Sequence, residues 1–220
     1  MRILVDFDGT ITDRDGFDLL SRHHAGPERW ERLDRAFLAG AITLRDVLEA
    51  QARCIIGTLD DARAYLEAET TVDPSFSDFV DRCVAGGHVV RIISSGVRQL
   101  IDASLTAHGI YGVEVAANAA IVKADGWELV FRDDSHFGHD KRVHVLDAQA
   151  MGERVIYIGD GISDFAASEF ADVRYAKAGS LLDEHLRTRC LPYTTFESFT
   201  DVLPEVIPAA APMARRDALR

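Results

Sequence analysis

The sequence predicts an α/β fold built on an open parallel sheet, and three short apolar runs carry this prediction. They are Ile3–Val5, Val89–Ile93 and Val155–Ile158, and each has the continuous apolar character of a buried strand. Helical patterns separate the runs, and polar or acidic residues follow each of them. Because ligands bind at the carboxyl ends of the strands in an open parallel sheet, we expect the functional residues there.

The composition fits a core domain that carries an insertion, or two small domains, since 47% of the 220 residues are hydrophobic. The formal net charge of -12 argues against a nucleic-acid or anionic-membrane surface, so a phosphate would need a local site. The three cysteines are far apart and form neither a disulfide framework nor a zinc pattern. Without a signal pattern or a run of about 18 apolar residues, we expect a cytoplasmic protein.

Residues 14–72 show helical patterns and no strand pattern, and we expect them to form an inserted helical cap. Apolar residues between 17 and 38 recur every three or four positions, which predicts one amphipathic helix. Thr43 is the expected N-cap of the next helix, and Thr58 or Asp60 that of a third. The predicted parts are therefore a core of residues 1–13 and 73–207, the cap, and a flexible tail, 208–220.

The rest of the predicted core alternates helices with strands. Turns at Asn118 and at Asp125-Gly126 are expected to join three short antiparallel strands into a small hairpin excursion at about 113–131. The remaining expected elements are helices at 76–84, 97–107, 141–150, 165–170 and 196–206, and a last strand at 173–176.

Two aspartates end the first predicted strand, in the run Asp6-Phe7-Asp8-Gly9-Thr10. Side chains one residue apart point in different directions, so their roles can differ. Asp6 can attack as a nucleophile, while Asp8 can pass a proton and offer its backbone carbonyl to a metal. Gly9 permits a sharp turn and Thr10 can hydrogen-bond a neighbouring group. The alternative is an acidic strand end without chemistry.

A second acidic segment follows the strand Val155–Ile158. Asp160 is flanked by glycines, including Gly161, and Asp164 comes four residues later at the start of a helix. Oxygen ligands from separate strand ends suit Mg²⁺. Taken alone, the segment could also be an Asx-turn with an ordinary N-cap.

Polar residues that suit a phosphate lie at two further places. The segment Ser94-Ser95-Gly96 offers a hydroxyl and backbone N–H groups at a strand-to-helix turn, although a serine there can also serve only as an N-cap. Lys141 opens a helix, against the dipole preference, which indicates a functional position, although most single lysines are solvated. We expect His136 and His139, in a predicted loop, on the surface.

As a set, these residues and their local contexts resemble the haloacid dehalogenase superfamily of phosphohydrolases. The resemblance runs from Arg2 to about Val206 and rests on the DxDGT, strand-S-x-G, lysine and GDGxSD signatures. It implies a doubly wound parallel sheet, the Rossmannoid core of that family, with helices on both faces. It also implies that residues 14–72 are a cap of the first type.

The resemblance implies hydrolysis of a small phosphorylated metabolite through an aspartyl-phosphate. Asp6 would be the nucleophile, and Asp8 would protonate the leaving group and then activate water. Mg²⁺ would be held by Asp6, the Asp8 carbonyl and Asp160, with support from Asp164. The phosphate would be bound by Ser94, the amides near Ser95 and Gly96, and Lys141.

Within the superfamily, the sequence resembles phosphoserine phosphatase and the methionine-salvage phosphatase that acts on 2-hydroxy-3-keto-5-methylthiopentenyl-1-phosphate. The residue that engages the substrate amine in the phosphoserine enzyme is here Asp15, and its carboxylate-binding arginine falls on Gln51, although Arg45 or Arg53 could substitute. The opening 6–18, with its ITDRDG run, favours the methionine-salvage enzyme. A phosphotransferase and a non-catalytic binding module are the alternatives from other classes.

Overall fold

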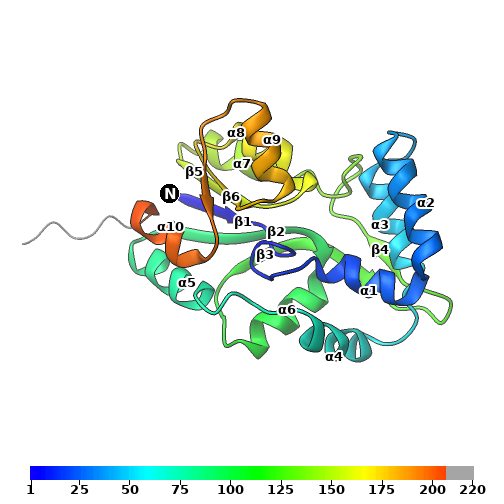
Figure 1. Ribbon diagram of the computed structural model, residues 1–220. Coiled ribbons are helices and arrows are strands. Elements are labelled where there is room, and N and C mark those ends of the chain that lie inside the picture. The colour runs from blue at the N-terminus through cyan, green and yellow to red at the C-terminus, as the bar shows by residue number, and fades with distance from the viewer. Residues whose placement is uncertain (207–220) are drawn as a thin grey trace, which may run out of the picture.

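The strands of the protein form one seven-stranded sheet in the computed structural model, which describes residues 1–206 (Figure 1). The strand order is β4-β3-β2-β1-β5-β6-β7, and every pairing is parallel except that of β3 with β4. The strands are β1 Arg2–Val5, β2 Val89–Val97, β3 Glu114–Ile121, β4 Glu128–Val130, β5 Val155–Gly159, β6 Val173–Lys177 and β7 Thr194–Phe196. The central strand β1 pairs with β2 on one side and with β5 on the other. From β1, successive strands of the chain are added first toward β4 and then, on the other side, toward β7. The predicted α/β class with a doubly wound parallel sheet is confirmed.

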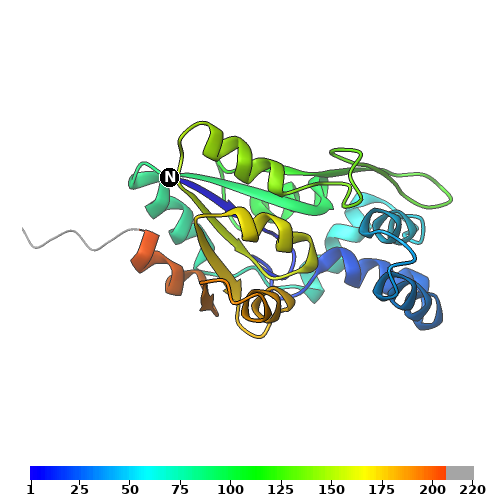
Figure 2. The ribbon, with the colours of Figure 1, turned by 90° about the horizontal axis from the view of Figure 1, so that it is seen from above.

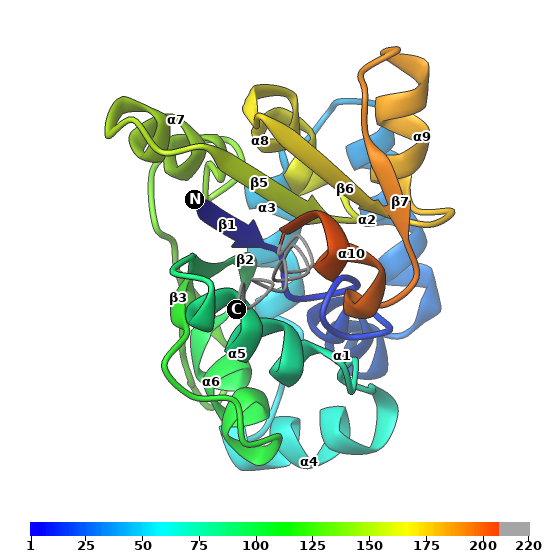
Figure 3. The same ribbon diagram turned by 90° about the vertical axis from the view of Figure 1, so that its left-hand side faces the viewer.

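Helices precede or follow each strand of this sheet and cover both of its faces (Figure 3). Ile3 and Val5 of β1 pack in one core with α5, α6 and α10, whereas Leu4 packs in another core with α7 and α8. Burial on both faces explains why these strands are continuously apolar. The helices are α1 Gly16–Ala25, α2 Pro27–Leu38, α3 Leu44–Ala52, α4 Leu59–Glu69, α5 Phe76–Ala85, α6 Arg98–Ala107, α7 Arg142–Ala150, α8 Phe165–Phe170, α9 Leu181–Thr188 and α10 Phe199–Val206.

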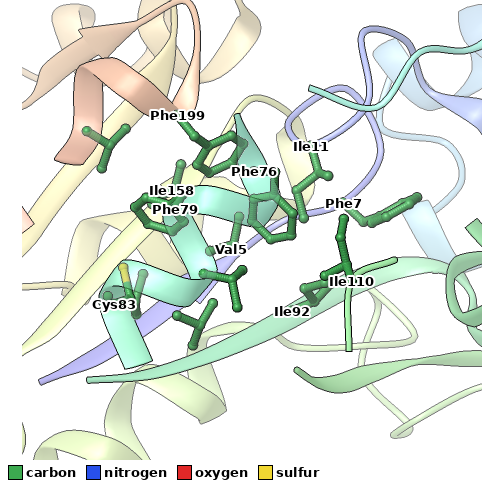
Figure 4. Packing of buried hydrophobic residues seen from close by; sticks show 14 of the residues in the cluster. Val5, Phe7, Ile11, Phe76, Phe79, Cys83, Ile92, Ile110, Ile158 and Phe199 are labelled. Atoms are coloured by element: carbon green, nitrogen blue, oxygen red, sulfur yellow. The ribbon is translucent and has the colours of Figure 1, made fainter. Parts of the chain in front are cut away.

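The larger core joins the start of the chain to its end (Figure 4). Phe76 and Phe79 of α5 pack against Phe199 of α10, with ring centroids 4.7 and 5.0 Å apart. The same cluster contains Val5 of β1 and Ile158 of β5. Packing of aromatic rings against the central strands fixes the sheet whose ends carry the acidic residues.

Helices α1–α4 lie beyond the carboxyl end of β1, at the opposite end of the sheet from the N-terminus (Figure 2). The segment leaves and rejoins the sheet at an isolated bridge between Thr12 and Val72. Trp127, between β3 and β4, donates from its indole Nε1 to the Gly57 carbonyl at 3.0 Å and so ties the hairpin to these helices. Their assignment as a separate cap stays a prediction.

The predicted N-caps are confirmed, but the single amphipathic helix at 17–38 is wrong. Thr43 caps α3 and Thr58 caps α4, each with a complete capping box. Gly26 has φ +74 and is followed by Pro27, so the chain turns and α1 and α2 are separate helices.

Two further differences concern the edges of the sheet. The predicted turn at Asn118 is wrong, because this residue lies fully buried inside the continuous strand β3. Helix α9 and strand β7 were not expected, since the helix is short and charged and Thr194 and Thr195 of the strand are exposed. The predicted tail, 208–220, lies outside the described residues. Within 1–206 no helix is long and apolar enough to cross a bilayer.

Candidate active site

The carboxyl ends of β1, β2 and β5 bring the predicted functional residues to one edge of the sheet. These strands are neighbours, so Asp6 after β1, Ser94 near the end of β2 and Asp160 after β5 lie side by side. All three line a cavity of about 460 Å³, together with Asp8. Residues of α1, α2 and α3 also line this cavity. The structure therefore brings these predicted residues together at the carboxyl end of the sheet.

Lys141 lies in the middle of the acidic group and is 1% exposed. Its Nζ lies 2.8 Å from Asp6 Oδ1 and 2.7 Å from Asp164 Oδ1. Burial lowers the pKa of Lys141, but the two carboxylates outweigh burial and raise it above its usual value. The alternative of a solvated lysine is therefore excluded, and the ammonium stays charged beside Asp6.

Both carboxylate oxygens of Asp164 accept hydrogen bonds from neighbours. Oδ1 accepts from Lys141 and, at 2.6 Å, from the Tyr157 hydroxyl. Oδ2 accepts from the backbone N–H groups of Asp160 at 3.0 Å and Gly161 at 2.9 Å. Burial opposes ionisation, but Lys141 lowers the pKa of Asp164 below its usual value. Asp164 therefore fixes both Lys141 and the turn that carries Asp160.

The oxygen-rich part of the site fits a hard divalent cation. Carboxylate oxygens of Asp6, Asp160 and Asp164 all lie within 4.8 Å of one another. Burial and the charge of Asp164 raise the pKa of Asp6 well above its usual value and that of Asp160 to about 7. Within residues 1–206 a single ammonium, that of Lys141, faces this group of acids, so a cation would relieve the remaining repulsion.

Thr10 and Gly9 position Asp160 as a possible ligand. The Thr10 hydroxyl donates to Asp160 Oδ1 at 2.6 Å, and this bond leaves Oδ2 for another partner. Gly9 has φ +78, and a Cβ there would lie 2.4 Å from Asp160 Oδ2. The position therefore requires glycine for both its backbone conformation and the space it leaves.

Asp8 occupies a different environment from Asp6, as the alternating directions predicted. Its Oδ1 accepts from the Gly16 backbone N–H of α1 at 3.1 Å, and its Oδ2 accepts from the Ser94 hydroxyl at 3.3 Å. Burial, followed by the charge of Asp15, raises the pKa of Asp8 to about 7. A carboxyl group with this pKa can hold and release a proton near neutral pH.

The predicted strand-to-helix turn at Ser94–Gly96 is wrong, because β2 continues to Val97 and these residues lie where its pairing with β3 shifts register, between Ile93 and Val97. The Gly96 N–H donates to the Ser94 hydroxyl at 2.9 Å, and a Cβ on Gly96 would lie 2.4 Å from Asp8 Oδ2. The Ser95 carbonyl accepts from Asn118 Nδ2 at 2.8 Å. Asn118 thus braces this irregular part of β2 from β3, a role hidden from the sequence because its partner is distant along the chain.

His139 is buried, so its predicted surface position is wrong, whereas His136 is exposed as expected. Nδ1 of His139 lies 2.8 Å from the Ser94 carbonyl, and Nε2 of His139 lies 2.8 Å from Nε2 of His144. Because a carbonyl only accepts, Nδ1 must carry the proton, and Nε2 of the neutral ring accepts from His144. Burial lowers the pKa of His139 to about 4. The His139 ring is therefore neutral when it donates its hydrogen bond to the Ser94 carbonyl.

We expect stability to rise with pH between about 4 and 6.5 more steeply in the native protein than in His139→Gln. In this window the unfolded histidine binds a proton and the folded one does not, so stability is lost as pH falls. The extra slope approaches about 1.4 kcal/mol per pH unit. Urea unfolding at pH 4.5, 5.5 and 6.5 measures it, with the exposed His136→Gln as the control. Equal slopes in the native protein and His139→Gln would contradict this assignment.

The three residues predicted to meet the substrate have different positions. Asp15 and Gln51 line the cavity, and Asp15 also caps α1 by accepting from Asp18 N–H at 2.8 Å. Arg45 lies elsewhere, where its Nη1 donates to the Asp133 carbonyl at 2.6 Å. Arg22 and Trp30, which the sequence did not single out, also line the cavity.

Comparisons with known proteins agree on one family. A family model described as haloacid dehalogenase-like hydrolase matches residues 3–169. Pdp3-interacting factor 1 of Schizosaccharomyces pombe is 31% identical and is matched over 91% of this chain and 92% of its own. The polyol phosphate phosphatase PYP1 of Saccharomyces cerevisiae is 27% identical, over 91% and 90% of the two chains. The 2-hydroxy-3-keto-5-methylthiopentenyl-1-phosphate phosphatase of Brevibacillus brevis is also 27% identical, over 91% and 92%.

Solved structures support the same fold. A phospho-aspartyl intermediate analogue of phosphoserine phosphatase aligns with a TM-score of 0.67 and 16% identity, over 93% of this chain and 97% of the other. A haloacid dehalogenase family hydrolase from Salmonella enterica serovar Typhi aligns with a TM-score of 0.74 and 15% identity, over 96% and 72%. At these identities the likeness concerns the fold alone.

Proposed function

This chain belongs to the haloacid dehalogenase-like hydrolases and is a phosphatase of that family, and we propose that it hydrolyses a small phosphorylated metabolite through an aspartyl-phosphate on Asp6. One observation carries the proposal. Asp6 lies 2.8 Å from the buried Lys141 ammonium and lines one cavity with Asp8 and Ser94. A nucleophile, a proton donor and phosphate-binding groups therefore meet at one point.

In the first step, a carboxylate oxygen of Asp6 attacks phosphorus as the bond to the ester oxygen breaks. Asp8 gives its proton to the departing alkoxide, so the organic product leaves as an alcohol. In the second step, Asp8 takes a proton from the water that attacks the aspartyl-phosphate, and phosphate is released with the Asp6 carboxylate restored. A pKa of about 7 suits Asp8 to both tasks.

Positive charge and hydrogen-bond donors hold the transferring phosphoryl group. Lys141 offsets the repulsion between the phosphate and Asp6. The Ser94 hydroxyl and the backbone N–H groups near Ser95 and Gly96 would donate to the phosphate oxygens; without substrate the Ser94 hydroxyl donates to Asp8 and the Gly96 N–H to Ser94 Oγ, so these two bonds would be exchanged on binding. Asp6, Asp160 and the Asp8 backbone carbonyl would hold Mg²⁺, with Asp164 in a supporting position. A bound magnesium ion would supply positive charge to the phosphate oxygens.

We expect removal of divalent metal to reduce phosphate release on the order of 10²-fold or more, because several kcal/mol of charge stabilisation are lost. Treatment with EDTA followed by gel filtration gives the metal-free protein, and added MgCl₂ should restore its rate. Turnover that is unchanged after chelation would contradict the assigned metal site.

We propose 2-hydroxy-3-keto-5-methylthiopentenyl-1-phosphate as the substrate, with residues 14–72 acting as the cap that selects it. The name of the Brevibacillus brevis relative supports this proposal, and so do the apolar residues Phe17, Phe37 and Leu48 in the cavity wall. Phosphoserine fits less well, since Gln51 stands where the carboxylate-binding arginine is expected.

The test is phosphate release from a panel of phosphomonoesters with and without Mg²⁺, including both of these compounds and a polyol phosphate. A magnesium-dependent preference for the methylthiopentenyl ester supports the proposed substrate. Transfer of phosphate to an added alcohol in place of water would indicate a phosphotransferase. No turnover of any ester by the folded, metal-loaded protein would refute the proposed function.

A further inference from the structure

Three buried polar atoms in the residues that line the active-site cavity have no hydrogen-bond partner within the described chain: the Ser95 hydroxyl oxygen in β2, and two atoms on the helices across the cavity. Of the two on the helices, one is the indole Nε1 of Trp30, a residue that is 2% exposed, and the other is Oε1 of Gln51, which is 6% exposed. Trp30 belongs to α2 and Gln51 to α3, two adjacent helices (Figure 1). An unpaired buried donor or acceptor costs free energy, so each atom would be stabilised by a ligand group that reached it.

The orientation of the Gln51 amide is fixed by its neighbour. Its Nε2 lies 3.4 Å from Asp18 Oδ1, and a carboxylate can only accept, so the nitrogen faces Asp18. Oε1 is therefore an acceptor without a donor, while Trp30 Nε1 is a donor without an acceptor. The helical side of the cavity, formed by α1, α2 and α3, thus contains one unpaired donor and one unpaired acceptor.

Among the described residues that line this part of the cavity, carboxylates outnumber cations, and the guanidinium of Arg22 is already paired. Arg22 donates from Nε to Asp18 Oδ2 at 2.6 Å and from Nη2 to Asp34 Oδ2 at 3.4 Å. Its guanidinium also lies over the Trp30 ring, 4.7 Å from the centroid. Asp15 adds a third carboxylate to the same cavity. A substrate carboxylate would meet no unpaired cation among the described residues that line this cavity.

These contacts select between three kinds of substrate group. A carboxylate only accepts, so it would leave Gln51 Oε1 unpaired and would face three aspartates. An ammonium group only donates, so it would leave Trp30 Nε1 unpaired. A hydroxyl both donates and accepts, so hydroxyl groups can pair with either atom without adding charge.

We propose that Trp30 and Gln51 bind hydroxyl groups of the substrate, and that the organic part of the substrate is uncharged and hydroxylated. This inference rests on the proposed function, because it concerns the substrate of the same cavity. Trp30 and Gln51 are then specificity-determining residues on the cap side of the cavity, across from the Ser94–Gly96 segment.

Steady-state kinetics on matched esters tests the substrate class. Ribitol 5-phosphate and glycerol 3-phosphate carry uncharged hydroxyls, phosphoserine adds a carboxylate, phosphoethanolamine carries only an ammonium, and para-nitrophenyl phosphate has none of these groups. We expect kcat/KM for the better polyol ester to exceed that for phosphoserine and phosphoethanolamine at least tenfold. An equal or higher value for either charged ester would overturn the inference.

Two substitutions test the residues themselves. Trp30→Phe removes the N–H but keeps an aromatic ring, and Gln51→Met removes the amide at similar length. We expect each to lower the ratio of kcat/KM for ribitol 5-phosphate to that for para-nitrophenyl phosphate about tenfold, the effect of one lost hydrogen bond in a buried site. Gln149→Met is the matched control, because the Gln149 amide binds the Phe170 carbonyl outside the cavity.

The outcomes separate this inference from the proposed function. Unchanged ratios in both folded variants overturn the role of Trp30 and Gln51, even if phosphatase activity is present. Turnover of every ester by Asp6→Asn overturns the proposed mechanism instead. Thermal unfolding identifies variants that do not fold. If Trp30→Phe does not fold, the kinetics of Gln51→Met decide the test.

Discussion

Asp6→Asn is expected to lower phosphate release from every substrate on the order of 10⁴-fold or more, as the loss of a nucleophile does. The amide keeps the size of the carboxylate, and its oxygen can still accept the Phe7 N–H, which lies 2.7 Å from Asp6 Oδ1. The charge that attacks phosphorus is lost. Release of phosphate from the best substrate, measured at saturating Mg²⁺, gives the effect on kcat.

The control for this substitution is Asp134→Asn, which makes the same chemical change at an exposed residue. Circular dichroism and thermal unfolding should show that both variants fold. Persistent turnover in Asp6→Asn, in preparations free of other phosphatases, would remove Asp6 as the nucleophile.

Lys141→Met should destabilise the fold by about 3–5 kcal/mol, the cost of removing one partner of a buried ion pair. The substitution keeps an unbranched side chain but leaves the Asp6 and Asp164 carboxylates without the ammonium that lies between them. Without this charge the pKa of both carboxyl groups rises, so we expect the loss to be smaller at pH 5 than at pH 8. Urea unfolding without added metal measures the free energy at each pH.

Lys123→Met provides the comparison. Lys123 forms an ion pair too, with the carboxylate of Glu128, but both side chains are half exposed. Its loss should destabilise the fold far less than the loss of Lys141, as is usual for surface pairs. Similar losses in the two lysine variants would show that the buried pair does not hold the site together.

The strands and the acidic ends of the sheet could be predicted because their signals are local. A parallel strand covered on both faces is continuously apolar, and Asp6, Asp8 and Asp160 directly follow such runs. Gly26-Pro27 also carries a local signal for a helix break, but the regular apolar spacing on either side obscured it.

The residues that brace the site were missed because their partners are far away in the chain. Asn118 binds a carbonyl 23 residues earlier, and His139 binds one 45 residues earlier. Tyr157 looks like part of an apolar strand, and its hydroxyl role depends on Asp164 beyond the strand end. Trp30 reaches the cavity only through the packing of α2, which spacing within one helix does not reveal.

The bracing of two consecutive carbonyls, Ser94 by His139 and Ser95 by Asn118, has a consequence for the end of the catalytic cycle. A backbone segment held at two consecutive carbonyls is ordered before any phosphate arrives, so binding costs little ordering entropy. The same rigidity does not distinguish an ester from the inorganic phosphate left after hydrolysis. Free phosphate should therefore compete with substrate, and the rate of the enzyme would follow the ratio of the two in the surrounding solution.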